Sequence, residues 1–241
     1  MSKDVFPVNE RNRVKRAHER GSYDRKTVYT ILDSGIIGYV AYVVDNQPYC
    51  TPTIYWREED HLYWHGSSAS RMLKNMTKGT PVCVTVSHLD GLVLARAAFE
   101  HSLNYRSVMC FGKAYIVDDP ARKEQALHAV VDRLYPDRAK SLRPITAQES
   151  KATMIIGMKI EQASAKVRNE GATDNEEDYA LPLWAGVIPI QTVIGTDEPC
   201  PRLLPEVNRP DNLSYYRSGR KLDEALIETQ NNYMSDFSPK K

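Results

Sequence analysis

The sequence has almost no net charge, few cysteines and no long hydrophobic run. Its 241 residues carry 32 Lys and Arg against 31 Asp and Glu, a formal net charge of +1, which argues against a nucleic-acid partner held by the charge of the whole chain. The four cysteines stand far apart with no Cys-x-x-Cys pair, which indicates reduced thiols in a cytoplasmic protein. No run of 18 apolar residues occurs, and the N-terminus does not resemble a secretory signal, so we expect no membrane partner.

The common catalytic signatures are also missing. The sequence contains no Gly-x-Gly-x-x-Gly, no Walker-type phosphate loop, no His-Glu-x-x-His and no Gly-x-Ser-x-Gly. His61 and His65 share one face of an expected strand with Tyr63, but at about 3.3 Å per residue their Cα atoms are about 13 Å apart. That separation is too long for one ion, so we expect no metal site.

The pattern of β-branched and aromatic residues predicts a mainly β protein with inserted helices. Helices are expected from a cap at Asp24 to Gly35, over residues 67–78, and from a cap at Asp119 to about residue 134. Residues 81–98 are expected to form a hairpin around Leu89-Asp90-Gly91. The expected strands are 36–44, 48–56, 61–66, 81–88, 91–98, 108–117 and 153–167. Antiparallel strands at this spacing favour a small closed barrel.

Composition divides the chain into three parts. Residues 1–35 are expected to form a basic N-terminal helical arm packed on the barrel, and residues 36–169 the barrel itself. Residues 170–241 hold an acidic loop and, from residue 181, seven of the 14 prolines. We expect this last part to be a Pro-rich strap and tail that carries no sheet of its own.

One segment suits an anion. After the expected strand ending at Gly66 come Ser67, Ser68 and Ser70, and then Arg71 in the first turn of a helix. Hydroxyls, free N–H groups and a guanidinium can together bind phosphate. The alternative is that one serine only caps the helix and Arg71 is solvated.

Two further segments are ambiguous. Residues 96–107 gather two arginines, His101, Asn104 and Tyr105, either as a solvated loop or as a polar site. Residues 184–189, beginning with Trp184, form an isolated apolar stretch. We interpret that stretch as a packed anchor rather than a lid over a ligand.

The order of these segments resembles the pyridoxamine 5′-phosphate oxidase-like, FMN-binding split-barrel family, in the branch of flavin-nucleotide-binding proteins related to nitroimidazole-resistance proteins. The motifs that carry the resemblance span about residues 10–190. They are Arg20-Gly21-Ser22-Tyr23-Asp24, Leu62-Tyr63-Trp64-His65-Gly66-Ser67, Leu89-Asp90-Gly91-Leu92-Val93-Leu94-Ala95-Arg96, Asn104-Tyr105-Arg106-Ser107-Val108 with Phe111-Gly112, Ala165-Lys166-Val167-Arg168, and Trp184-Ala185-Gly186-Val187-Ile188-Pro189.

The resemblance implies a six-stranded split β-barrel that forms a homodimer with FMN at the subunit interface. It implies that the strand 50–55 lies along the flavin ring, and that His65 contacts substrate or delivers a proton, unless it only holds the flavin or the loop. The residues it assigns to the cofactor are Thr51, Pro52, Thr53, His65, Gly66, Ser67, Ser70 and Arg71, with Tyr105, Arg106, Ser107 and Trp184 from the other subunit.

One departure from the family bears on the reaction. True pyridoxamine phosphate oxidases follow the Trp-x-Gly segment with Glu-Phe-Trp and Arg-x-His-Asp-Arg, whereas Pro189 here is followed by Ile-Gln-Thr-Val. We therefore expect an FMN-dependent oxidoreductase acting on another small molecule, with NADH or NADPH as a possible donor. The alternative is a flavin- or haem-binding sensor or store without turnover. Relatives on this barrel also bind deazaflavin or haem. For a haem, His65 and His101 are the candidate ligands.

Overall fold

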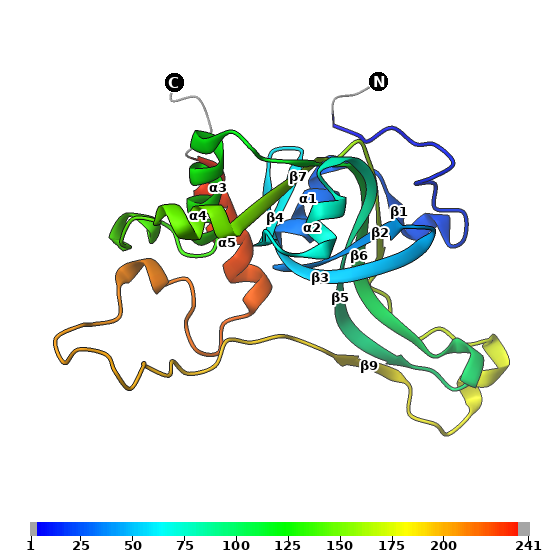
Figure 1. Ribbon diagram of the computed structural model, residues 1–241. Coiled ribbons are helices and arrows are strands. Elements are labelled where there is room, and N and C mark those ends of the chain that lie inside the picture. The colour runs from blue at the N-terminus through cyan, green and yellow to red at the C-terminus, as the bar shows by residue number, and fades with distance from the viewer. Residues whose placement is uncertain (1–3, 236–241) are drawn as a thin grey trace.

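A computed structural model of the chain describes residues 4–235. Its strands form one antiparallel sheet in the order β1-β8-β6-β7-β4-β3-β2-β5-β9, and a further pairing between β6 and β5 closes six of them into a ring (Figure 1). The mainly β class predicted from the sequence is confirmed. The strands are β1 (Gly21–Ser22), β2 (Ile37–Val44), β3 (Gln47–Glu58), β4 (His61–Ser67), β5 (Lys78–Leu94), β6 (Ser102–Ile116), β7 (Thr153–Lys159), β8 (Gln162–Arg168) and β9 (Gly186–Pro189).

Helices cover the ring at two places. The α-helices are α1 (Arg25–Asp33), α2 (Arg71–Asn75), α3 (Pro120–Asp132), α4 (Ala147–Ala152) and α5 (Leu222–Ser235). Apolar side chains of α1 and α2 join the core inside the ring. A second cluster, with Trp56 and Tyr63 on its sheet side, packs against α3 and α5. None of the described helices is long and apolar enough to cross a membrane.

Local sequence explains several element boundaries. The Asp24 carboxylate accepts a hydrogen bond from the Thr27 backbone N–H at 2.8 Å, and Asp119 caps α3 in the same way through Arg122, so both expected caps are confirmed. Asp45 and Asn46 both adopt positive φ between β2 and β3. This two-residue turn matches the right-handed twist of the flanking strands and favours Asp and Asn.

Two sequence-based expectations fail at strand junctions. The hairpin expected over 81–98 does not form, because β5 continues through Leu89-Asp90-Gly91 and absorbs the irregularity as a bulge opposite β6. Arg106 binds both oxygens of Asp90, which fastens the bulge to the neighbouring strand. The single strand expected over 153–167 is interrupted after Lys159, where its carbonyl approaches Gly112 so closely that a Cβ there would lie 2.2 Å away.

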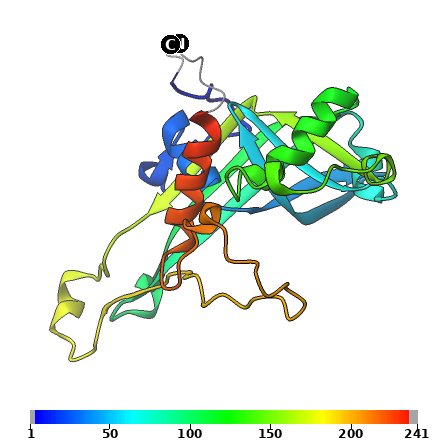
Figure 2. The same cartoon turned by 90° about the vertical axis from the view of Figure 1, so that its left-hand side faces the viewer.

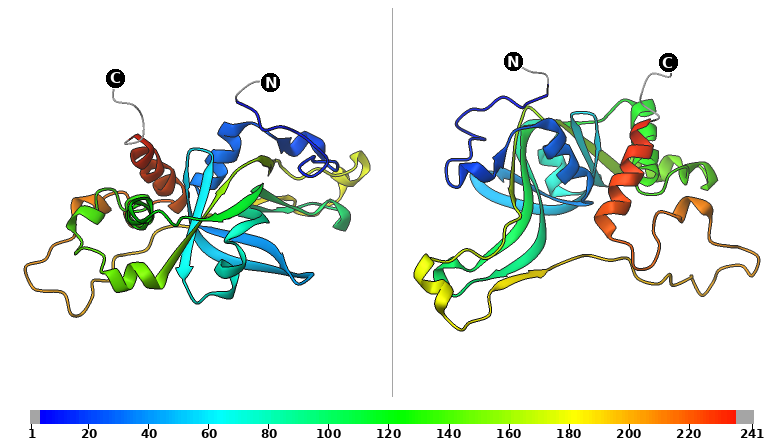
Figure 3. Two further views of the ribbon diagram at one scale, coloured as in Figure 1. Left: turned by 45° about the horizontal axis from the view of Figure 1, so that its top comes forward. Right: turned by 180° about the vertical axis from the view of Figure 1, so that it is seen from behind.

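Beyond the ring, β5 and β6 extend as a long projection, which we call the arm (residues 89–105 together with 169–189). β9 pairs with β5 from Gly91 to Leu94, so it lies on the arm and not on the ring. The Pro-rich part of the chain therefore adds one strand to the edge of the existing sheet. Figure 3 shows the arm leaving the ring from both viewing directions.

Residues 190–221 run from the arm back to α5, including a wide loop on the side away from the arm (Figure 2). The loop meets the rest of the chain again where Val193 bridges Lys221. This path makes residues 190–192 and the start of α5 neighbours in space.

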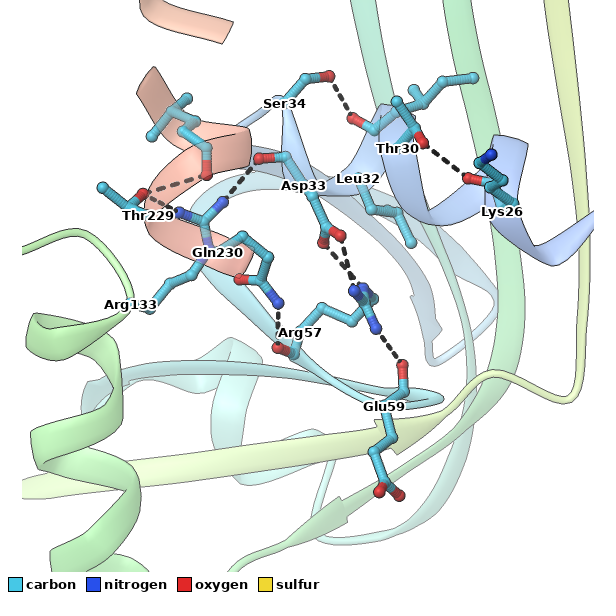
Figure 4. A network of polar contacts seen from close by, with 12 residues as sticks. Lys26, Thr30, Leu32, Asp33, Ser34, Arg57, Glu59, Arg133, Thr229 and Gln230 are labelled. Atoms are coloured by element: carbon cyan, nitrogen blue, oxygen red, sulfur yellow. Dashed lines mark hydrogen bonds and ion pairs between the residues drawn. The ribbon is translucent and has the colours of Figure 1, made fainter. Parts of the chain in front are cut away.

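A buried polar network fixes α5 to the ring (Figure 4). Arg57 on β3 donates to both oxygens of Asp33 at 2.8 and 2.6 Å. Arg133, which follows α3, donates to the Asp33 carbonyl and to the Thr229 hydroxyl. Gln230 donates to the Arg57 carbonyl. Four segments distant in sequence are thus joined through hydrogen bonds to charged groups, the stronger class of hydrogen bond.

Candidate functional site

The interior of the ring is filled by side chains. Val40, Trp64, Met76 and Val84 are fully buried there, with no more than 1% of their surface exposed, and belong to one continuous apolar core. A ring packed in this way has no room for a cofactor. Any cofactor must therefore bind on the outside of the sheet.

One edge of β3 is open on the outside. β3 pairs with β2 over Gln47–Ile54 but with β4 only over Tyr55–Glu58, so no described strand pairs with the second edge of its first eight residues. The Tyr55 N–H donates to Ile36 before β2, and the alternation along an antiparallel strand then directs the N–H groups of Cys50 and Ile54 to the open edge. Pro52 has no N–H to leave unpaired, as expected for proline at an edge.

The surface beside this edge is apolar. Ile37, Tyr39 and Val43 on β2, Ile54 on β3 and Met109 on β6 are 44–57% exposed. They alternate with buried residues such as Val40 and Cys110, so they lie on the outer side of the sheet. We call these five residues the outer apolar face. A contiguous exposed apolar surface of this kind marks a ligand or protein contact.

His65 lies on the outer side of β4. The structure confirms that it shares a face with His61 and Tyr63, and its ring centroid is 6.3 Å from that of Trp56. Burial lowers the pKa of His65 below its usual value of 6.5, which favours the neutral ring near neutral pH. Its Nδ1 is buried with no hydrogen-bond partner among the described residues.

The connection from β4 to α2 holds four of the expected cofactor residues. A Cβ on Gly66 would meet the Leu73 side chain at 3.1 Å, so the backbone there packs closely on α2. The Ser67 hydroxyl oxygen accepts from the Ala69 N–H, and Ser70 caps α2. Each hydroxyl still has its own hydrogen to donate.

Arg71 follows directly in α2. Its guanidinium lies over the Tyr49 ring, 4.8 Å from the centroid, and no carboxylate of the described chain pairs with it. An exposed arginine with its donors free and its plane held by an aromatic ring is suited to a phosphate. α2 is shorter than the helix expected over 67–78, so the guanidinium and the two serine hydroxyls are the groups that would bind an anion.

The backbone N–H groups of Thr51 and Thr53 face β2 and not the open edge, by the same alternation. These two residues alternate with the outward residues of β3, and the Thr51 hydroxyl lies 3.3 Å from the Tyr42 hydroxyl. Tyr42 is part of the core. Thr51, Pro52 and Thr53 are thus in the strand expected beside the flavin, but the free edge donors belong to their neighbours.

The remaining expected residues lie on or beside the arm, apart from this group. Ser107 donates to the Lys166 carbonyl of β8, and Tyr105 pairs with Leu89 and Arg168 across the sheet. Trp184 packs on Gly186 but remains 66% exposed. The expectation that Trp184 is a packed anchor is wrong for the single chain, because no described element covers it.

Arg106 lines a cleft of about 530 Å³ between the ring and the strap. Asp90 and Asp223 bind its guanidinium at 2.7 to 3.1 Å, and these bonds raise the pKa of Arg106 further. His88 also lines the cleft, and burial lowers the pKa of His88. Asp223 stands 117 residues from Arg106, and nothing in the sequence marks that pairing.

Comparison with known proteins bears on the whole arrangement. Residues 24–167 match the family model described as pyridoxamine 5′-phosphate oxidase. The chain belongs to the pyridoxamine 5′-phosphate oxidase-like family. The match spans the ring and the β4–α2 connection, so the family resemblance found from the motifs is confirmed. No curated protein matches the chain.

Solved structures extend the similarity to a larger share of the chain than the family model matches. The flavocytochrome Anf3 from Azotobacter vinelandii is 44% identical over 88% of this chain and 98% of its own, with a TM-score of 0.82. An FAD- and haem-binding protein from Mycobacterium smegmatis is 33% identical over 84% of this chain and 98% of its own, with a TM-score of 0.79. A putative 5-nitroimidazole resistance protein from Bacteroides thetaiotaomicron, 22% identical over 61% of this chain and 86% of its own, shares the fold at a TM-score of 0.50.

Proposed function

We propose that this chain is a dimeric flavin-dependent oxidoreductase of split-barrel type that also binds a haem. The observation that carries the proposal is the 44% identity to a flavocytochrome over 88% of the chain. The second relative, named for FAD and haem, points to the same pair of cofactors. Vitamin B6 oxidation is not part of the proposal, because the substrate-gripping Arg-x-His-Asp-Arg segment is missing from the sequence.

The chain's own groups fit a flavin at the outer side of β3. The edge N–H groups of Cys50 and Ile54, with the carbonyls beside them, suit the alternating donors and acceptors of an isoalloxazine ring. Arg71, Ser67 and Ser70 supply donors for the phosphate. The outer apolar face would then be shared between the flavin and a second copy of the chain, which would remove its exposed apolar surface from water.

When bound, a flavin supplies hydride or single-electron transfer. In that pocket His65 would lie beside the flavin with its ring neutral, so its free nitrogen can accept a proton or a hydrogen bond. The exposed Trp184 and the half-buried Tyr105 on the arm would reach the partner's pocket. The roles of Trp184 and Tyr105 follow from the family resemblance, and the exposure of Trp184 supports its role.

The first test is the visible spectrum of the purified full-length protein, with the released cofactors identified by mass. Flavin and Soret bands together support the proposal, and the mass separates the expected FMN from the FAD named in the Mycobacterium smegmatis relative. A colourless protein that takes up neither added flavin nor added haem refutes it.

The phosphate contact is tested with Arg71→Ala. We expect flavin affinity to fall roughly 10- to 100-fold, the value of one or two hydrogen bonds to a charged group, with the far-ultraviolet circular dichroism unchanged. Lys74→Ala, which removes an exposed cation from the same helix, is the matched control and should retain flavin. Equal affinity in both variants would remove Arg71 from the site.

A second candidate function is a flavin- and haem-binding sensor or store without turnover. It is favoured by the lack of any recognisable catalytic motif in the sequence. Steady-state oxidation of NADH or NADPH by the loaded protein separates the two functions. A sensor should give no more turnover than free flavin at the same concentration.

A further inference from the structure

The arm holds one histidine in the arrangement that metal-binding histidines adopt. His101 follows a short turn at the tip of the arm, and its Nδ1 lies 3.0 Å from the carbonyl oxygen of Ala97. A carbonyl can only accept, so Nδ1 carries the proton and the neutral ring has its lone pair on Nε2. Metal-ligating histidines almost always hold the opposite ring nitrogen in this way. The ring is exposed, so Nε2 is accessible.

The turn that positions His101 is itself firmly held. The buried carboxylate of Asp174 accepts from the backbone N–H groups of Arg96 and Ala97 at 2.7 and 3.1 Å, and it also pairs with the Arg96 guanidinium. The Arg96 guanidinium in turn lies over the Tyr179 ring. These contacts tie the residue that binds the His101 ring to the other half of the arm. The orientation of the ring is therefore set before any ligand arrives.

The surroundings of His101 are apolar and unprotected. Phe99, two residues before it, is 91% exposed, and Leu103, two residues after it, is 47% exposed. The chain that covers the other side of the arm adds the exposed Leu181 and Leu183. In Figure 1 this second segment, in yellow, lies against the end of the β5–β6 projection. Large exposed apolar side chains around an accessible imidazole suit the flat, apolar macrocycle of a haem.

The other histidines of the chain fit this role less well, and His128 is half-buried on α3. The Nε2 of His88 is already bonded to Ser34 and to the Ile31 carbonyl. The Nδ1 of His65 has no partner among the described residues to orient the ring. His61 pairs with Asp60, but it lies in a charged turn beside Lys159. His18 is an exposed residue near the N-terminus, with 85% of its side chain accessible.

We propose that His101 would bind the haem iron through Nε2 and that the exposed apolar side chains of the arm tip would contact the haem. This inference rests on the haem binding proposed above. It assigns a function to the tip of the arm in addition to the flavin contacts proposed for Arg71, Ser67 and the β3 edge on the ring.

The test uses the full-length protein loaded with flavin and haem. In His101→Gly we expect haem retention to fall by more than about tenfold, or the Soret band to shift to that of a haem without this ligand. Flavin content and the unfolding temperature should stay at the wild-type values. Added imidazole should restore the wild-type spectrum. His18→Gly is the matched control, since it removes another exposed histidine, and it should change nothing.

The outcomes separate the two proposals. A wild-type Soret band and haem content in His101→Gly would overturn the assignment of His101 while leaving haem binding intact. Loss of haem without rescue by imidazole would also count against a ligand role and favour a packing effect. A wild-type protein that binds flavin but takes up no haem overturns the inference and keeps the flavin function. A wild-type protein that binds neither refutes the proposed function itself.

Discussion

Replacing Asp33 by asparagine tests how much the buried Asp33–Arg57 ion pair in the network of Figure 4 contributes to stability. The substitution keeps the shape of the side chain and removes its charge. Arg57 then remains buried, with only 8% of its side chain exposed, beside a neutral amide in place of the carboxylate it contacts through two nitrogens. Arg133 should stay in place, because it binds the backbone carbonyl of residue 33.

The expected loss of stability follows from these contacts. Breaking a buried ion pair by removing one partner costs about 3–5 kcal/mol, because the remaining charge is left uncompensated. In the Asp33→Asn variant the new amide oxygen would still accept one hydrogen bond, and Arg57 keeps its bond to the Glu59 carbonyl. We therefore expect the lower end, about 3 kcal/mol. In a domain with a typical net stability of about 5–15 kcal/mol, that is a large fraction.

Urea unfolding of the cofactor-free protein at fixed concentration measures this loss, because bound ligands and partner subunits raise the apparent stability. Asp137→Asn is the matched control. It removes the same charge from the exposed pair with Lys140, whose side chains are 65% and 78% accessible, and exposed pairs contribute at most about 1 kcal/mol. If the two variants had free energies of unfolding within about 1 kcal/mol of each other, the buried Asp33–Arg57 pair would not carry the stability assigned to it.

Two further predictions concern pH and close packing. Burial lowers the pKa of both His65 and His88, so the unfolded chain binds protons more readily than the folded chain. The free energy of unfolding should therefore fall as the pH drops below the ordinary histidine pKa of about 6.5. Urea unfolding at pH 7 and 5.5 should show a smaller fall in the double variant His65→Gln/His88→Gln than in the wild type, and an equal fall would contradict the burial argument. Gly112→Ala should lower the unfolding temperature strongly, because its Cβ would lie 2.2 Å from the Lys159 carbonyl oxygen. The control Gly171→Ala, with nothing within 4 Å of its Cβ, should leave the unfolding temperature unchanged. Similar unfolding temperatures for the two variants would show that the β7–β8 junction can relax.

Much of the local structure could be predicted from neighbouring residues. The caps at Asp24 and Asp119 and the turn at Asp45-Asn46 each depend on side-chain and backbone preferences within a few residues. The alternation along β2 separates inward from outward residues without reference to any partner strand. Such features are local, and for that reason the sequence-based prediction agrees with the structure.

The failures arise where distant parts of the chain decide the outcome. Leu89-Asp90-Gly91 has the composition of a turn, but pairing with β6 and β9 on both sides keeps it extended as a bulge. Trp184 belongs to an apolar stretch that composition marks as an anchor, yet no described element covers it. Pairing partners and coverage depend on the whole fold, so no window of sequence contains them.

The same division applies to the candidate sites. Ser67, Ser70 and Arg71 are neighbours in sequence, so their grouping as an anion site follows from the sequence itself together with the expected strand end. The open edge of β3, the cleft at Arg106 and the orientation of His101 by the Ala97 carbonyl follow from the fold. The sequence by itself determined which residue types stand at each strand end and turn. Tertiary structure decided which strand edges stay unpaired and which histidine ring is oriented by a backbone carbonyl, because these features depend on how distant segments of the chain pair.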